Sequence, residues 1–230
     1  MEKICVIGSS YMGAVYKAYE LDMQKSAQVE IDFFGNGRMS FGLIDIVGGE
    51  IKNARFRNSK NAATSVYDAF FIYGDMLTPH DMIATEKKLR RHAYSSQVVA
   101  SVKSDKIKGT QSWQLYNKVK NVTSKPVYIL SSNVMLETPA LTNEKQYQFG
   151  VNALEEVLGP NTYHPFPRTI FSDCFQPQDM YYKASVYLDG KAADPSRHAN
   201  HDMCHMNELG GKLILDSMIS RLGQKKRPSL

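Results

Sequence analysis

Short apolar runs, each ending at a turn residue, recur along the chain and predict buried β-strands. The clearest runs are residues 4–7, 29–34, 69–73 and 127–130, followed by Gly8, Gly35, Gly74 and Ser131. They are rich in β-branched and aromatic residues and lack alternating polar positions, as is typical of strands covered on both faces. The pattern therefore predicts a parallel sheet.

Between these runs, apolar residues three or four positions apart predict amphipathic helices. The expected helices cover residues 11–25, a segment around 113–119, residues 143–158 and residues 209–222. The Pro-rich stretch 161–201 is too long for a plain connection, so we expect a structured loop or a short strand at 184–188 within it. Strands that alternate with helices through right-handed crossovers predict a three-layer α/β/α sandwich.

The carboxyl ends of the predicted strands mark the expected binding edge, because open α/β sheets bind their ligands there. The turns that follow the four strands, residues 8–11, 35–37, 74–76 and 131–133, should therefore lie along one rim. Any chemistry carried by these turns should act on the same bound molecule.

Size and charge limit the classes of function. The chain has 230 residues and a net charge of +5, which suits one domain over residues 1–223 with a basic tail over 224–230. Lys87, Lys88, Arg90 and Arg91 form another dense basic run, but their helical spacing indicates a solvated helix face. A nucleic-acid interface needs a concentrated basic face with interspersed aromatic residues, so we expect no nucleic-acid partner.

The cysteines and the N-terminal residues bear on location. Cys5, Cys174 and Cys204 are odd in number and widely spaced, which favours a reducing compartment over a disulfide framework. The first residues lack the pattern of a secretory signal, and no apolar run approaches the length of a membrane span. We therefore expect a cytoplasmic protein with no membrane span.

The first predicted turn, from Gly8 to Gly13, joins a strand to a helix. It lacks the middle glycine of a dinucleotide-binding loop and the Lys-Ser/Thr pair of a P-loop. What remains is Ser9 and Ser10 at a helix start, where backbone N–H groups and the helix dipole favour developing negative charge. One interpretation is a nucleophile that forms an oxyanion; the alternative is that a serine only caps the helix.

A second polar cluster, residues 198–207, precedes the last predicted helix. Asp202 stands three residues before His205, so its carboxylate can orient the imidazole and leave Nε2 free for a serine hydroxyl. With Ser10 this would complete a Ser-Asp-His triad. Two alternatives stay open: a metal site built from His198, His201 and His205 with Asp202 or Cys204, or a plain polar loop. Cys204 is disfavoured as a nucleophile because its side chain should point away from this site.

In these two places the chain resembles the SGNH, or GDSL-type, hydrolase superfamily. Its first block, strand-Gly-Asp-Ser-helix, is similar to residues 4–11, with Ser9 in place of the acidic residue and Ser10 at the nucleophile position. Its last block, Asp-x-x-His before a helix, is similar to residues 202–211. Because these anchors lie near opposite ends, the resemblance spans almost the whole chain, and it implies a flavodoxin-like central sheet.

The resemblance also implies an oxyanion hole. Backbone N–H groups of Ser10, Gly35 and Gly74 are the expected donors, with Gly37 a second candidate beside Gly35. The asparagine of the family's Gly-x-Asn-Asp block is absent, because this chain reads Gly-Asp-Met-Leu from Gly74. Asn36 and Asn133 lie on the same predicted rim and are possible substitutes.

By this resemblance the chain is a serine esterase that works without a cofactor. The implied reaction is two-step hydrolysis of an acyl ester through a covalent acyl-enzyme, with an O-acetyl group on a carbohydrate as the expected substrate. The alternative is a weak or catalytically silent relative that binds glycans or transfers acyl groups. The sequence does not specify the acyl length or the oligomeric state.

Overall fold

One mixed sheet forms the centre of the molecule, in the strand order β5-β2-β1-β6-β7-β8. Its strands are β1 (Glu2–Gly8), β2 (Val29–Gly35), β5 (Phe56–Arg57), β6 (Ala69–Tyr73), β7 (Val127–Leu130) and β8 (Tyr163–His164). All neighbours run parallel except β5, which pairs antiparallel with the end of β2. The computed structural model describes residues 1–22, 29–132, 141, 143–183, 185–187, 196–197 and 205–224.

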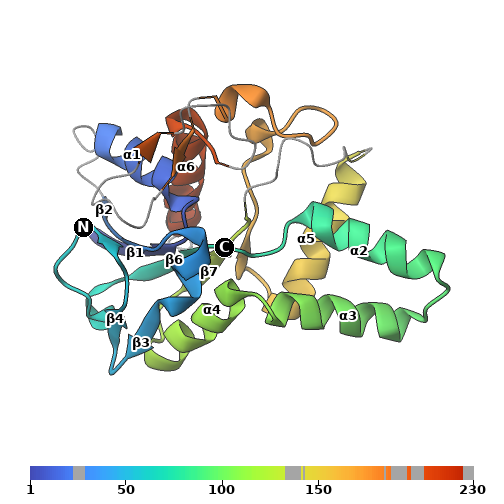
Figure 1. The fold of residues 1–230 in the computed structure, drawn as a ribbon, viewed down its shortest axis with the longest axis horizontal. Coiled ribbons are helices and arrows are strands. Elements are labelled where there is room, and N and C mark those ends of the chain that lie inside the picture. Colours follow the sequence, from blue (N-terminus) through green and yellow to red (C-terminus); the bar gives the residue numbers. More distant parts are fainter. Residues whose placement is uncertain are drawn as a thin grey trace.

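Helices and a small hairpin cover the two faces of this sheet (Figure 1). The helices are α1 (Met12–Asp22), α2 (Pro79–Arg91), α3 (Ser96–Lys108), α4 (Gln111–Val122), α5 (Glu144–Leu158) and α6 (Glu208–Gln224). Helices α1 and α6 lie side by side on one face, whereas α4 and the hairpin of β3 (Asp45–Val47) and β4 (Glu50–Lys52) cover the other. The three-layer α/β/α sandwich expected from the sequence is confirmed.

Side chains of the central strands alternate between two buried cores, which explains why the strands read as unbroken apolar runs. Along β1, Ile4 and Val6 join the core beneath α1 and α6, whereas Cys5 and Ile7 join the core beneath α4. Each of these four side chains is fully buried. Burying a side chain of this size contributes about 1.5–3 kcal/mol, so both faces of β1 stabilise the sheet.

The four predicted strands are all present, but β8 was not predicted. It is only two residues long and lies in the Pro-rich stretch, so no apolar run marks it. Within the same stretch the predicted strand at 184–188 is present as the short β9 (Val186–Tyr187), which pairs antiparallel with β10 (Ser196–Arg197). Short strands defined by pairing rather than by composition leave little trace in a sequence.

The predicted apolar side of the last helix is wrong at one position. Ile214, Leu215, Met218 and Leu222 are buried, but Leu209 is 57% exposed. Leu209 lies in the first turn of α6 and faces solvent, although the next two residues, Gly210 and Gly211, are buried.

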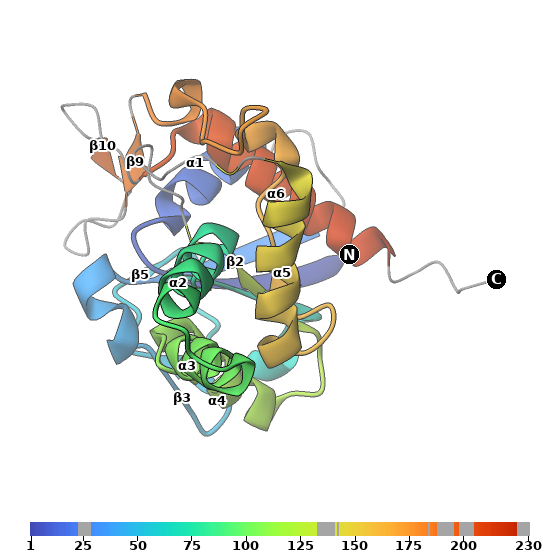
Figure 2. The same ribbon diagram turned by 90° about the vertical axis from the view of Figure 1, so that its right-hand side faces the viewer.

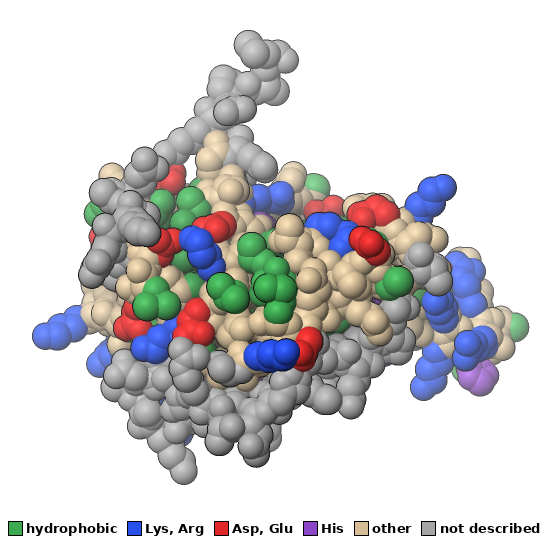
Figure 3. Space-filling model, turned by 90° about the horizontal axis from the view of Figure 1, so that it is seen from above, with side chains coloured by type: hydrophobic (Ala, Val, Ile, Leu, Met, Phe, Trp, Pro, Cys, Tyr) green, Lys and Arg blue, Asp and Glu red, His purple; other side chains and the backbone are tan. Residues whose placement is uncertain are grey.

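Helices α2 and α3 extend from the sheet as an antiparallel pair packed against α5 (Figures 1 and 2). The basic run at Lys87, Lys88, Arg90 and Arg91 is exposed on α2, as its helical spacing predicts. Figure 3 shows Lys and Arg side chains gathered at that end of the molecule. Short 3-10 helices complete the fold at η1 (Arg38–Leu43), η2 (Thr64–Val66), η3 (Arg168–Ile170) and η4 (Asp179–Tyr181).

Candidate active site

Ser10 lies in the tight turn that joins β1 to α1 at the carboxyl end of the sheet. Gly8 makes the turn possible, because a Cβ there would lie 2.8 Å from Met12 Cβ and 2.9 Å from Tyr73 O. The N–H of Ser9 donates to Tyr73 O at 2.8 Å, which ties the turn to β6. Ser10 is therefore held at the rim where the sequence predicts a binding site.

The serine hydroxyls of this turn do not cap α1. The N–H groups of Met12 and Gly13 donate instead to the carbonyls of Ser9 and Ser10, at 3.1 and 3.2 Å. Ser9 Oγ is buried and has no hydrogen-bond partner among the described residues. The hydroxyl of Ser10 is thus available for another contact.

His205 provides that contact, with its Nε2 3.0 Å from Ser10 Oγ across a separation of 195 residues. The histidine is partly buried, and its ring lies against Tyr11 with 5.2 Å between the ring centroids. A neutral imidazole at this distance can accept the serine proton as a general base, which is the arrangement that activates a hydroxyl for attack. The structure therefore joins the two residues that the sequence placed at opposite ends of the chain.

Asn207 fixes the segment that carries His205. Its Oδ1 accepts from the N–H groups of Leu209 and Gly210 at the start of α6, at 3.0 and 3.2 Å. Its Nδ2 donates to the carbonyls of Met180 and Lys183, at 2.7 and 3.0 Å. One buried side chain thus caps α6 and clamps the loop before it, a role for which N-cap asparagine is well suited.

A close approach of α6 to α1 sets the distance between the two halves of the site. A Cβ on Gly211 would lie 2.1 Å from Ala14 O and 2.9 Å from Val15 N, so only glycine allows this packing. Because α1 follows Ser10 and α6 follows His205, their contact holds the serine and the histidine together.

Several backbone N–H groups on the rim are free to bind an oxyanion. Among the described residues, those of Ser10, Gly37 and Gly74 donate to no acceptor. Gly35 differs: the Asn36 N–H donates to Gly8 O on β1, so the Gly35 N–H faces β5 on the opposite side of the strand. The Gly35 N–H therefore points away from β1, whereas the N–H of the second candidate, Gly37, has no acceptor among the described residues.

The side-chain amide that the resemblance implies is absent at the end of β6. Met76 occupies the asparagine position and is fully buried. Asp75 is engaged elsewhere, because its carboxylate accepts from the N–H groups of Gln111 and Ser112 at the start of α4. Gly74 is needed for packing, since a Cβ there would lie 2.2 Å from the Phe41 ring.

Asn36 does not replace the missing amide. Its Nδ2 donates to the carbonyls of Ser40 and Asn53, at 2.9 and 3.0 Å, and its Oδ1 accepts from the Arg55 N–H at 2.8 Å. Both amide hydrogens are used in holding the loop after β2. The other predicted substitute, Asn133, lies outside the described residues.

Tyrosines form the buried surroundings of the pair. Tyr11 and Tyr73 lie with ring centroids 6.3 Å apart. Burial raises the pKa of Tyr73 well above its ordinary value, and the neighbouring Tyr182 and Tyr11 raise it further. The Tyr73 phenol therefore stays neutral at physiological pH and carries no charge toward His205.

Other predicted residues of the C-terminal cluster lie outside the described part of the chain. They are Asp202, the predicted orienting carboxylate, together with His198, His201 and Cys204. Among the described residues, no three His, Cys, Asp or Glu side chains are grouped so as to hold a metal ion. The metal-site alternative depends on His198 and His201, so it stays a prediction.

The sequence did not single out a second serine–histidine pair. Ser217 Oγ, on α6, lies 2.9 Å from Nε2 of His164, at the end of β8. No motif precedes either residue. Only the pairing of β8 with β7, which was itself not predicted, could have placed this histidine under α6.

Two further observations concern location. In the described part of the chain, no helix combines the length and the apolar composition needed to cross a bilayer. Cys5 is buried and Cys174 exposed, and both are free thiols. The cytoplasmic location stays a prediction.

Comparison with known proteins gives a distant likeness in fold. No protein-family model matches the chain, and no curated protein matches it. Among solved structures it is similar to a lipase from a goat rumen metagenome, at 12% identity and a TM-score of 0.46, over 96% of this chain and 97% of the lipase. At this identity and overlap we draw nothing about activity from the lipase.

Proposed function

We propose that this protein is a serine hydrolase of acyl esters, with Ser10 as nucleophile and His205 as general base. The observation that carries the proposal is the 3.0 Å contact between Ser10 Oγ and His205 Nε2 at the carboxyl rim of an α/β/α sandwich. Ligands of such sheets bind at this rim, so a substrate there would meet the activated hydroxyl.

In the proposed reaction, Ser10 Oγ attacks the ester carbonyl while His205 Nε2 takes the hydroxyl proton. The protonated imidazole then gives that proton to the leaving alcohol as the C–O bond breaks, which leaves an acyl-enzyme. Water, deprotonated by His205, attacks the acyl carbon and releases the acid and Ser10. In this proposal Asp202 orients the imidazole, as expected from its position three residues before His205.

The oxyanion would be held by backbone groups alone. The N–H groups of Ser10, Gly37 and Gly74 are free among the described residues and lie on the turns that follow three neighbouring strands. Loss of one oxyanion donor costs about 10²–10³ in rate, so an enzyme without the asparagine amide should be slower than one that has it. An O-acetyl group on a carbohydrate remains the proposed substrate, on the SGNH resemblance.

Labelling with a fluorophosphonate probe tests the proposal. The probe reacts covalently with an activated serine, so the wild-type protein should be labelled and Ser10→Ala should not. His205→Ala should be labelled far more slowly, since the hydroxyl then loses its base. Labelling of Ser10→Ala at the wild-type rate would show that the reactive serine is elsewhere and would overturn the proposal.

A second candidate is a weakly active or silent relative that binds glycans or transfers acyl groups on the same fold. It is favoured by one observation, the buried Met76 in the position of the oxyanion asparagine. Hydrolysis of p-nitrophenyl acetate separates the candidates. Saturable hydrolysis that Ser10→Ala abolishes supports the esterase, whereas sugar binding without hydrolysis supports the silent relative.

A further inference from the structure

A polar hollow of about 320 Å³ lies beside the carboxyl end of β2, and the ester chemistry proposed above makes no use of it. Its walls come from β2, β4, β5 and the segment 60–63. The side chains that matter for its charge are those of Glu50, Lys52, Asn53, Arg57, Lys60 and Asn61. Carbohydrates and other highly polar ligands require such a lining, because apolar walls leave their hydroxyls unpaired.

The hollow has an excess of positive charge. Lys52 forms an ion pair with Glu50. Arg57 and Lys60 have no ion pair or hydrogen bond to any described residue through their side chains. Two uncompensated cations in one hollow suit an oxyanion, which an arginine can bind through two parallel hydrogen bonds.

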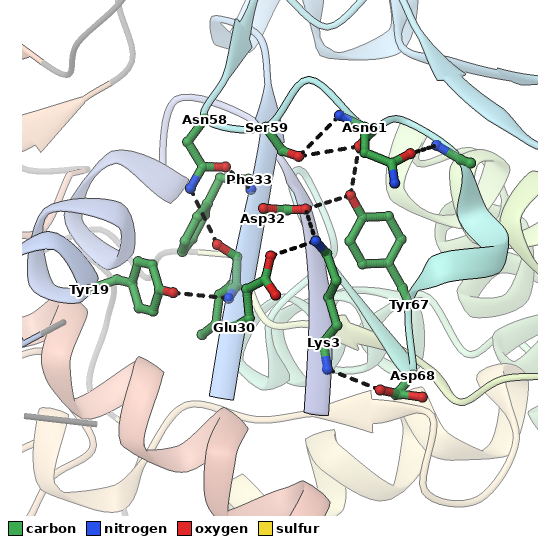
Figure 4. Close-up of polar contacts among 12 residues, drawn as sticks. Lys3, Tyr19, Glu30, Asp32, Phe33, Asn58, Ser59, Asn61, Tyr67 and Asp68 are labelled. Carbon is green, nitrogen blue, oxygen red and sulfur yellow. Dashed lines mark hydrogen bonds and ion pairs between the residues drawn. The ribbon is translucent and has the colours of Figure 1, made fainter. Parts of the chain in front are cut away.

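Hydrogen bonds to the sheet hold one wall of the hollow in place (Figure 4). Asn58, between Arg57 and Lys60, accepts from the Phe33 N–H at 2.7 Å and donates to Ile31 O at 3.2 Å. The hydroxyl of Tyr67 lies 2.9 Å from the carbonyl of Asn61. Since the backbone of this wall is fixed before a ligand arrives, binding would have to order only the exposed side chains of Arg57 and Lys60.

A buried carboxylate supports that wall from beneath. Asp32 Oδ2 lies 2.8 Å from the Tyr67 hydroxyl and 3.2 Å from Lys3 Nζ, and Figure 4 shows the three side chains together. Burial raises the pKa of Tyr67, so the phenol keeps its proton and remains a donor. Asp32 thus has the Tyr67 hydroxyl as a donor and shares Lys3 with Glu30, so its charge is partly compensated within this network.

The hollow lies two strands from the strand that leads to the proposed catalytic serine, on the face of the sheet that α4 and the β3–β4 hairpin cover. β5 pairs with β2 and β2 with β1, so Arg57 and the strand that leads to Ser10 are two strand spacings apart, about 10 Å. Asn36, at the rim, bonds to the backbone of Asn53 and Arg55 and so ties the two regions together. A ligand that reached both Arg57 and Ser10 would cross the carboxyl edge of the sheet, which suits an oligosaccharide better than a small acyl ester.

We propose that the hollow binds an oxyanion of the substrate, a carboxylate or phosphate, through Arg57 and Lys60. The substrate class would then be an O-acylated acidic carbohydrate. This inference rests on the proposed function for the identity of the ligand as substrate, but binding in the hollow does not depend on catalysis.

Calorimetric titration of the Ser10→Ala protein tests binding separately from hydrolysis. The probes are trigalacturonate for a carboxylate, maltose phosphate for a phosphate, and maltotriose as the neutral sugar. We expect at least one acidic sugar to bind about tenfold or more tightly than maltotriose, as for a charge-assisted contact. That preference should disappear when Arg57→Gln and Lys60→Gln are combined in the same protein.

A matched control removes two cations elsewhere. Lys87→Gln combined with Arg91→Gln, on the exposed face of α2, makes the same change in net charge and should leave the affinity unchanged. Equal weakening by the control pair would show nonspecific attraction and overturn the proposal. So would equal affinity for acidic and neutral sugars, or the absence of acidic-sugar binding at millimolar concentration.

Kinetics of the otherwise wild-type protein separate the two proposals. The Arg57→Gln/Lys60→Gln variant should keep the wild-type rate on p-nitrophenyl acetate, which carries no anion. Binding of an acidic sugar without ester hydrolysis would contradict the proposed esterase activity but support the oxyanion site in the hollow. Ester hydrolysis without a preference for acidic sugars would contradict the oxyanion site in the hollow but support the proposed esterase activity.

Discussion

Two serine–histidine pairs in this molecule have nearly the same geometry and very different surroundings. Ser10 and His205 lie 3.0 Å apart at the carboxyl rim beside α1, and Ser217 and His164 lie 2.9 Å apart between α6 and β8. His164 is buried, with its ring edge-on to Phe71, and its Nδ1 has no hydrogen-bond partner among the described residues. A short Oγ–Nε2 distance is therefore common to both pairs and distinguishes neither.

The surroundings decide which pair can do acid–base chemistry. A general base works best with a pKa near the working pH. Burial, with a smaller effect of the cation of Arg221, lowers the pKa of His164 to about 4. Near Ser10, by contrast, the serine N–H is free among the described residues, and the turn that carries the hydroxyl lies at the carboxyl edge of the sheet, where open α/β sheets bind their ligands. We assign the Ser217 pair a structural role on this difference.

The largest expected effect comes from removing the two serine hydroxyls separately. Ser10→Ala should lower kcat/KM for p-nitrophenyl acetate by about 10³-fold or more, because the nucleophile is lost. Ser217→Ala, which removes the matching contact in the other pair, should leave the rate within a few-fold of wild type. If Ser217→Ala lowered kcat/KM as much as Ser10→Ala, the structural role assigned to the Ser217 pair would be wrong.

The packing that holds the first pair together can be tested with two glycines of α6. Gly211→Ala should destabilise the fold by roughly 3 kcal/mol, because its methyl group would overlap the backbone of α1. It should also lower activity in the protein that remains folded, since α6 can relieve the overlap only by moving away from α1. Urea denaturation and kcat measured below the transition provide the two readouts.

Gly223→Ala is the control on the same helix. A Cβ at this position meets nothing within 4 Å. The substitution should therefore leave kcat unchanged and stabilise the helix slightly, by up to about 1 kcal/mol. If Gly223→Ala lowered activity as much as Gly211→Ala, close contact with α1 would not be the cause.

Lowering the pH should reduce the stability of the folded protein through His164 of the second pair. The folded-state pKa of His164 is about 4, below its ordinary value of 6.5, so the unfolded chain binds a proton in this range and the folded chain does not. The contribution of neutral His164 to the free energy of unfolding is fully present above pH 6.5. It is lost as the pH falls toward 4, by up to roughly 3 kcal/mol.

Unfolding free energies of wild type and His164→Gln at several pH values measure this effect. The wild type should lose more stability than the variant between about pH 6.5 and 4, and the two should change in parallel at higher pH. His80, which is also buried with a lowered pKa, is present in both proteins, so the difference isolates His164. If the unfolding free energies of the two proteins changed in parallel over the whole pH range, the prediction that His164 is neutral in the folded protein would be wrong.

The smallest expected effect concerns Asn207, which fixes the segment carrying His205. Asn207→Ala should cost about 2 kcal/mol, since it removes a helix cap and leaves two carbonyls without their donor. Activity should fall as well, because His205 is two residues away. Ser95→Ala removes a comparable cap from α3, far from the site, and should lower stability without changing kcat.

The sheet and the contact between Ser10 and His205 were predictable for the same physical reason. Strands buried on both faces require unbroken apolar runs, and a tight turn at their carboxyl ends requires residues such as Gly8. The contact of Ser10 with His205 followed from motifs at both ends of the chain. The apolar runs and the two motifs are each local in sequence, although the sheet and the Ser10–His205 contact join residues far apart in the chain.

What could not be predicted depends on packing between distant residues. The direction of the Gly35 N–H follows from the register of β2 with β1 and β5, and a glycine in the sequence does not reveal that register. The engagement of Asn36 with Asn53 and Arg55, and the need for glycine at 211, likewise appear only when distant segments meet. The oxyanion donors were therefore the weakest part of the prediction.

The close contact between α1 and α6 also bears on how the proposed site is assembled during synthesis. The pair joins residues 195 positions apart, and bringing them together is a late and slow step for a growing chain. Until residues near Gly211 leave the ribosome, the part of α1 that α6 covers is exposed to other nascent chains. Fragments released early should lack the Ser10–His205 contact and be prone to aggregate, which couples assembly of the proposed site to completion of the fold.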